Sequence, residues 1–142
     1  MRINGYWSQA GWPAIYALVE CSFPYVRGYV EFALDTGSPF SILSQADAQK
    51  LSVNYNKLSR APKPLIIATF ADPPYVLKNV SITPYKSHHQ ESLSEVFVIP
   101  PEKELKKSIP MPSILGRDFL NRFHVILKKG QGEIILTDEL VL

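Results

Sequence analysis

The amino-acid sequence predicts a mostly β protein with one or two short helices. Three observations lead to this prediction. Apolar residues recur in short runs, several runs alternate between apolar and polar positions, and turn formers such as proline and glycine separate the runs. Helical signals are confined to two brief stretches, so strands dominate the expected fold.

The size and composition of the chain are those of one globular domain. The chain has 142 residues, of which 46% are apolar and 20% are charged. The net charge of +2 is weak, and the basic residues are spread out apart from a small cluster at Lys103, Lys106 and Lys107. We therefore expect no nucleic-acid partner.

No apolar run is long enough to span a membrane, so we expect no membrane partner. Residues 1–16 lack the apolar centre of a secretory signal. The single Cys21 excludes an internal disulfide and a cysteine-rich metal site. These features together predict a cytoplasmic location.

The first predicted hairpin joins residues 14–21 to residues 27–34 through a proline-containing connection. In the second strand, alternate residues such as Phe32 and Ala33 face opposite sides. Asp35 continues the Ala33 face, so alternation lets its side chain point away from the main core.

A short helix is predicted over residues 45–51. Ser44 can serve as its N-cap, with Asp47 three residues later as a weak form of the capping box. After a polar loop, residues 65–70 and 75–82 are strand-like, and an Asp-Pro-Pro turn between them predicts a second hairpin.

The last part of the chain contains further strands and a second helical stretch. Residues 93–100 predict a strand, whereas the charged and proline-rich residues 101–113 predict an exposed loop or a single helical turn. Residues 113–123 combine a strand end, a glycine and a short helix. Residues 124–129 and 132–136 predict a final hairpin.

An unusual polar stretch, Asp35, Thr36, Gly37 and Ser38, interrupts the apolar run at residues 32–43. A reactive carboxylate needs a defined position, hydrogen bonds to its charged form and room for a substrate. A strand end supplies the position, nearby N–H and hydroxyl groups could supply the hydrogen bonds, and glycine leaves space. An ordinary turn could have the same four residues.

Two motifs in the right order and spacing indicate a family more specifically than either motif alone. The segment ALDTGSPFSIL resembles the active-site segment of aspartic proteases, and SILGRDFL resembles the second signature of their retroviral-type branch. The predicted helix and hairpin between them also follow that family's order. The chain is thus similar to retropepsin-like aspartic proteases over about residues 14–136. The resemblance implies a closed β-barrel-like acid-protease fold in a single domain, residues 1–142, of the homodimeric form.

The resemblance assigns roles to the first motif. Asp35 would be the catalytic aspartate, and Gly37 would hold its carboxylate through the backbone N–H. Thr36 would hydrogen-bond to the equivalent loop of the partner subunit. Ser38 would orient the outer oxygen of the carboxylate.

In the second motif, Ile114, Leu115 and Gly116 would form a turn that packs beneath the catalytic loop. Arg117 would make structural salt bridges near the subunit interface. Asp118 would begin the short helix.

The resemblance also places a flap over the cleft at the tip of the second predicted hairpin. Its substrate-contacting residues would be Ala68, Thr69, Phe70, Ala71, Asp72, Pro73 and Tyr75. Flaps of this family usually carry glycines, but this tip has none and contains Pro73 and Pro74. Because proline fixes φ and removes a donor, we expect a stiffer or differently shaped tip.

The chemistry of aspartic proteases needs two carboxylates that share one proton. The chain holds a single Asp-Thr-Gly, since Asp47, Asp72 and Asp138 are not followed by such a glycine. A two-fold symmetric homodimer would bring a second Asp35 to the axis. No metal or other cofactor is required. Chain ends of the family interleave between subunits, and the candidates here are Tyr6, Trp7, Leu140, Val141 and Leu142.

The remaining reactive residue types predict no further site. His88 and His89 are expected to be solvated in a polar loop, and His124 opens a strand. Cys21 lacks a basic neighbour that would activate it.

Two functions from different classes therefore remain. One is an aspartic endopeptidase that acts on peptides or unfolded proteins. The other is a retropepsin-fold dimerisation or peptide-binding module with little or no catalysis, which the glycine-free flap favours. The Asp-Thr-Gly-Ser stretch favours the enzyme, because a binding module has no chemical need for it.

Overall fold

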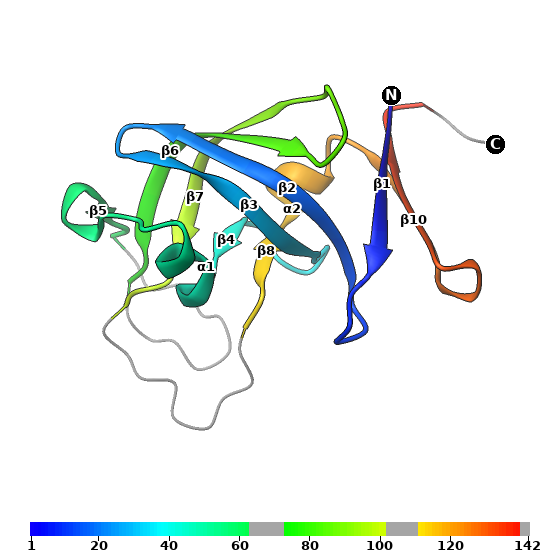
Figure 1. The fold of residues 1–142 in the computed structure, drawn as a ribbon, viewed down its shortest axis with the longest axis horizontal. Helices are drawn as coiled ribbons and strands as arrows, with labels where there is room; N and C mark the ends of the chain where they lie inside the picture. Colours follow the sequence, from blue (N-terminus) through cyan, green and yellow to red (C-terminus); the bar gives the residue numbers. More distant parts are fainter. Residues whose placement is uncertain (63–72, 102–110, 140–142) are drawn as a thin grey trace.

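The computed structural model describes residues 1–62, 73–101 and 111–139, and these residues form a mostly β fold, as the sequence predicts (Figure 1). The strands are β1 (Arg2–Trp7), β2 (Pro13–Ser22), β3 (Tyr25–Leu34), β4 (Ile42–Leu43), β5 (Ser59–Arg60), β6 (Tyr75–Pro84), β7 (Glu91–Val98), β8 (Ser113–Leu115), β9 (His124–Lys128) and β10 (Glu133–Thr137). The helices are α1 (Gln45–Lys50) and α2 (Arg117–Leu120), with short 3-10 helices η1 (Tyr55–Lys57) and η2 (Lys129–Gln131).

Six of the strands close into a barrel. β2 pairs with β3, β3 with β8, β8 with β4, β4 with β7, and β7 with β6. β6 then pairs back with β2, with Ala17 opposite Pro84 and Glu20 opposite Ser81. The predicted closed, barrel-like fold is therefore confirmed, and closure removes the free edges that these strands would otherwise expose.

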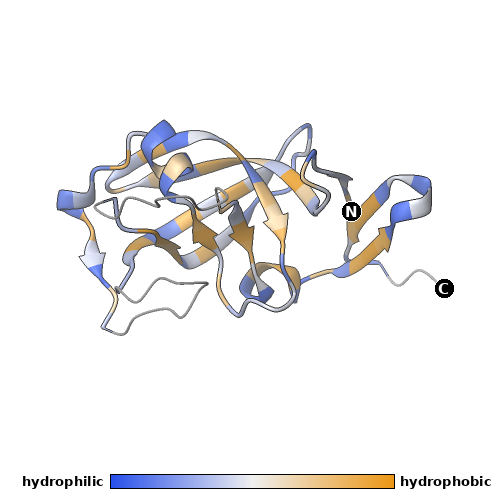
Figure 2. Cartoon of the chain, turned by 90° about the horizontal axis from the view of Figure 1, so that it is seen from below, coloured by the Kyte–Doolittle hydropathy of each residue, from blue (hydrophilic) through white to orange (hydrophobic). Residues whose placement is uncertain are grey.

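The interior of the barrel is apolar, and apolar residues alternate with polar ones along several strands (Figure 2). The largest fully buried side chains include Phe32, Phe119, Ile15, Leu77, Ile82 and Leu115. A second, smaller apolar cluster consists of Ile42, Ala61, Val76, Phe97, Ile99 and Ile114, with Met111 packed against it. Burial of these side chains is the main favourable contribution to folding.

Helix α1 begins where its cap predicts. The Ser44 hydroxyl accepts a hydrogen bond from the backbone N–H of Asp47 at 3.1 Å. The sequence did not predict a link from this cap to β8. The Ser113 hydroxyl donates to the Asp47 carboxylate at 2.6 Å and accepts from the backbone N–H of Ser44 at 2.9 Å. This network attaches α1 to the barrel.

Outside the barrel, β1, β9 and β10 extend the sheet. β9 and β10 form the predicted final hairpin, and the first residues of β1 pair with β10. Tyr6 and Trp7, two of the residues expected in an intersubunit sheet, lie opposite β2 of their own chain, at Ala14 and Pro13. The other candidates, residues 140–142, lie outside the described residues, and the intersubunit sheet stays a prediction.

The two predicted hairpins near the N-terminus and in the middle of the chain have different outcomes. The first is confirmed as β2 and β3. For the second, β6 corresponds to the predicted residues 75–82, while residues 65–70 lie outside the described residues, as do the flap positions 68–72. β6 pairs with β7 and with the short β5. In the described parts of the chain, no helix is long and apolar enough to cross a membrane.

Candidate active site

Asp35 lies directly after β3, where the strand leaves the barrel. Its backbone N–H donates to the carbonyl of Leu115 at 3.0 Å, which continues the parallel pairing of β3 with β8 by one residue. The side chain is half-buried. The barrel therefore fixes the backbone of Asp35 and leaves its carboxylate within reach of solvent.

The turn after Asp35 provides a hydrogen bond to its carboxylate. The Gly37 backbone N–H donates to Oδ1 of Asp35 at 2.9 Å, and the Ser38 N–H donates to the Asp35 carbonyl at 3.2 Å. A Cβ atom on Gly37 would lie 3.1 Å from the same Oδ1, closer than most such contacts. The turn therefore fixes the orientation of the Asp35 carboxylate through one backbone donor.

The second motif lies against this turn. A Cβ atom on Gly116 would lie 2.4 Å from the Phe40 carbonyl oxygen and 2.6 Å from that of Ser38. The Arg117 N–H donates to the Ser38 carbonyl at 2.8 Å. Only glycine fits at position 116, so the structure brings the two motifs into backbone contact.

Ser41 is a positioning residue that our reading of the sequence missed. Its hydroxyl accepts from the Gly116 N–H at 3.1 Å and donates to Oδ1 of Asp118 at 2.6 Å, and its own N–H donates to Oδ2 at 3.0 Å. Ser41 is fully buried. The sequence did contain a signal, since Ser41 is the second serine of the Ser-x-x-Ser spacing that begins at Ser38.

Arg117 and Ser38 both donate to backbone carbonyls of the Asp35 loop. Within this chain the Arg117 guanidinium donates to the Thr36 carbonyl at 3.1 Å, and the salt bridges expected near the subunit interface stay a prediction. We expected the Ser38 hydroxyl to orient the carboxylate, but it donates to the Phe40 carbonyl at 2.6 Å. Both side chains stabilise the backbone of the loop, where a carbonyl is the nearest acceptor. The side chain of Thr36 is exposed.

Two of the predicted flap residues, Pro73 and Tyr75, are described. The Tyr75 ring packs edge-on against Tyr55, with ring centroids 4.9 Å apart, and the Arg60 guanidinium lies 4.4 Å from its centroid. The Tyr55 hydroxyl donates to the Ile99 carbonyl at 2.9 Å. The base of the predicted flap is thus attached to the end of β7.

Apolar side chains lie next to the carboxylate loop. Ile42 and Ile114 are opposite one another in β4 and β8, and both belong to the second apolar cluster. Phe40 packs edge-on against Phe97 at 5.1 Å between centroids and remains 38% exposed. The loop that carries Asp35 therefore borders a buried apolar cluster, and the Phe40 ring is exposed beside it.

The histidines differ in part from expectation. His124 opens β9 and is exposed, but His89 is half-buried and binds the Glu91 carboxylate, which also accepts from Arg122 at 2.9 Å. Burial raises the pKa of Glu91, but the hydrogen bonds from Arg122 and His89 outweigh it and lower that pKa. Cys21 is buried. Within residues 1–62, 73–101 and 111–139, no three or more His, Cys, Asp or Glu side chains are grouped as metal ligands.

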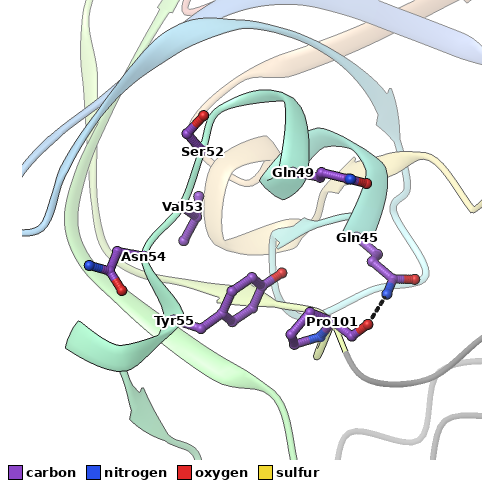
Figure 3. A pocket seen from close by; sticks show the side chains of 7 residues that line it. All are labelled: Gln45, Gln49, Ser52, Val53, Asn54, Tyr55 and Pro101. Atoms are coloured by element: carbon purple, nitrogen blue, oxygen red, sulfur yellow. Dashed lines mark hydrogen bonds between the residues drawn. The ribbon is translucent and has the colours of Figure 1, made fainter.

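A separate cavity of about 600 Å³ lies between α1, η1 and Pro101 (Figure 3). Its lining is Gln45, Gln49, Ser52, Val53, Asn54, Tyr55 and Pro101. The Gln45 amide donates to the Pro101 carbonyl across it. None of these residues belongs to either motif, so this cavity is not part of the Asp35 site.

Comparison with known proteins supports the fold. No protein-family model and no curated protein sequence matches the chain. Among solved structures, the crystal structure of a retropepsin-like aspartic protease from Rickettsia conorii is similar, with a TM-score of 0.64 and 21% sequence identity. The similarity covers 96% of this chain and 89% of that one. The chain therefore has a retropepsin-like fold.

Proposed function

We propose that this protein is an aspartic endopeptidase that acts as a two-fold symmetric homodimer. The observation that carries the proposal is the carboxylate of Asp35 at the end of a barrel strand, bonded to the Gly37 N–H and held in place by the second motif. A retropepsin-like fold around this loop adds support. The second carboxylate that the chemistry needs would be Asp35 of the other copy.

In the proposed reaction, the two carboxylates share one proton, because two like charges in contact cannot both ionise easily. The ionised Asp35 takes a proton from a water molecule, whose oxygen attacks the carbonyl carbon of the peptide. The protonated Asp35 donates to the carbonyl oxygen. The tetrahedral intermediate then collapses, the C–N bond breaks, and a proton passes to the leaving nitrogen.

The residues around Asp35 would position rather than react. The Gly37 N–H would hold one oxygen of the carboxylate, and Gly116 would allow the two motifs to lie in contact. The exposed ring of Phe40 favours apolar side chains in the substrate. An extended peptide would bind largely through main-chain hydrogen bonds.

A second candidate function is a dimerising or peptide-binding module with little catalysis. Two observations favour it: the predicted flap tip has no glycine and contains Pro73 and Pro74, and the Ser38 hydroxyl is bonded to the Phe40 carbonyl instead of to the carboxylate. Such a module would bind peptides without cleaving them.

Digestion of a broad peptide library tests the proposal. We expect the wild type to cleave peptides and Asp35→Asn to lose cleavage. The matched control is Asp138→Asn, which removes an exposed carboxylate and should cleave like the wild type. Peptide binding without cleavage by the wild type would favour the second function. Equal cleavage by wild type and Asp35→Asn would refute an aspartic mechanism.

Mixing experiments test whether the site needs two copies. If one catalytic group comes from each chain, wild type mixed with Asp35→Asn forms heterodimers with a single aspartate, and the rate falls with the square of the wild-type fraction. Measurement of the solution mass across concentrations accompanies this assay. A protein that cleaves as a monomer, with a rate linear in the wild-type fraction, contradicts the homodimer.

A further inference from the structure

A second cavity, of about 490 Å³, lies between the start of β1 and the turn that follows β6. In Figure 1 these two segments lie near the N-terminus, at the end of the barrel where β6 turns into β7. The lining residues are Arg2, Ile3, Asn4, Tyr85, Lys86, Ser87 and His88. None of them belongs to the Asp35 site.

The polar side chains of this cavity are basic or neutral. Arg2, Lys86 and His88 line it, and the described residues of its lining include no carboxylate. Arg2 donates through Nε to the Asn4 side chain at 3.2 Å, which leaves its terminal guanidinium nitrogens for another acceptor. Across the described ranges, no carboxylate forms an ion pair with any of the three. The cavity therefore suits an anion.

Lys86 adopts a backbone conformation that is unfavourable for a lysine. Its φ is 61°, in the left-handed region, within a turn closed by a hydrogen bond of 3.0 Å from the Ser87 N–H to the Pro84 carbonyl. Glycine or asparagine adopts this conformation at lower cost. Strain at a residue with a charged side chain in a cavity is an indication of a functional site.

An exposed aromatic ring lies beside the charges. Tyr85 lines the cavity and is 52% exposed. Its ring packs against those of Tyr16 and Tyr29, each with centroids 5.7 Å away, and its backbone N–H donates to the Tyr16 carbonyl at 2.8 Å. The Lys86 ammonium also lies over this ring, 5.5 Å from its centroid. These contacts fix the ring next to the positive charge, and its exposed part can stack a planar group without losing much side-chain freedom.

We propose that this cavity binds a nucleoside monophosphate. Its phosphate would accept hydrogen bonds from the fork of the Arg2 guanidinium and from the Lys86 ammonium. The Ser87 hydroxyl and the His88 ring lie in the same lining and are further donors. The base would stack on Tyr85, since the flat face of a nucleobase stacks on aromatic side chains. The cavity volume of about 490 Å³ lies in the usual range of small-molecule sites.

Calorimetric titration of the full chain with adenosine monophosphate tests the proposal. Lys86→Asn removes the charge but keeps a residue that tolerates the left-handed conformation, and Arg2→Gln removes the guanidinium fork. We expect each variant to weaken binding by about tenfold or more, as for the loss of a charge-assisted hydrogen bond. Lys78→Ala, an exposed lysine of β6 outside the cavity, is the matched control and should bind like the wild type.

Two controls accompany the titration: one tests whether binding needs the phosphate, and the other tests whether the variant is folded. Adenosine, which lacks the phosphate, should not bind, and thermal melting should show that Lys86→Asn is folded. Saturable binding that is equal in wild type, Lys86→Asn and Arg2→Gln overturns the proposal, as does the absence of saturable binding to the wild type. Asp35→Asn should bind the nucleotide normally, so failure here is distinct from failure of the proposed protease activity.

Discussion

The Asp118 carboxylate binds Ser41 twice, accepting from its backbone N–H at 3.0 Å and from its hydroxyl at 2.6 Å. The same hydroxyl accepts from the Gly116 N–H at 3.1 Å. Helix α2, the Gly116 turn and the end of the Asp35 loop are therefore joined through one buried serine. The position of the Asp35 loop therefore depends on Ser41 and Asp118, two side chains that do not bind the Asp35 carboxylate.

Ser41→Ala should destabilise the protein. The change leaves the buried Gly116 N–H without its acceptor and the Asp118 carboxylate with one donor fewer, which costs about 2–3 kcal/mol in the free energy of unfolding. Denaturant unfolding measures this loss, with Ser92→Ala, an exposed serine of β7, as control. Peptide cleavage should fall more than the folded fraction does. A loss of stability equal to that of Ser92→Ala would contradict the role of Ser41.

Gly116→Ala should be far more damaging than Gly130→Ala. At position 116 the new Cβ would collide with two backbone carbonyls, so the loop must move, and we expect a loss of more than about 3 kcal/mol. A Cβ at Gly130 meets no atom within 4 Å, so this control should change stability by less than about 0.5 kcal/mol. Thermal or denaturant melts compare the pair. Similar stability of the two variants would show that the motifs do not lie in contact.

Ser38→Ala distinguishes two roles of this hydroxyl. In the structure the hydroxyl donates to the Phe40 carbonyl, so its loss should cost about 1 kcal/mol of stability and leave kcat within a few-fold of wild type. If the hydroxyl instead orients the carboxylate in the active dimer, kcat falls strongly with little change in stability. Steady-state kinetics and unfolding measured on the same preparation decide between the two.

Glu91 should stabilise the protein above acidic pH. Because its hydrogen bonds to Arg122 and His89 lower its pKa in the folded state, its contribution is present above its ordinary pKa and is lost as pH falls through the lowered value. Glu91→Gln should therefore reduce the free energy of unfolding at neutral pH by about 1–2 kcal/mol. As pH decreases, the free energy of unfolding of Glu91→Gln should approach that of the wild type, and unfolding curves at several pH values measure both. Two results would contradict this account. One is a difference in the free energy of unfolding that does not change with pH, and the other is an equal loss of stability in Glu95→Gln, which changes an exposed carboxylate.

Local patterns were enough to predict several elements. The proline-containing connection between β2 and β3, the Ser44 cap of α1 and the β9–β10 hairpin depend on residues close together in the chain, so a short window contains the information. The position of Asp35 after a strand also follows from alternation along β3.

Contacts between distant residues were not predictable in this way. The closure of the barrel by β2 and β6, the binding of Ser41 to Asp118 and the pairing of β1 with β10 join residues far apart in the chain. The Ser38 and Arg117 side chains were assigned by resemblance, and their partners in the structure are neighbouring carbonyls that the motif alone does not reveal.

The sequence by itself determined the mostly β class, the capped helix and the two motifs, because spacing and turn chemistry act over a few residues. Only the tertiary structure decided that Gly116 lies against the carbonyls of Ser38 and Phe40, and that Arg2 and Lys86 line one cavity. These relationships depend on how the strands close into a barrel, and that closure brings together segments that are far apart in the chain.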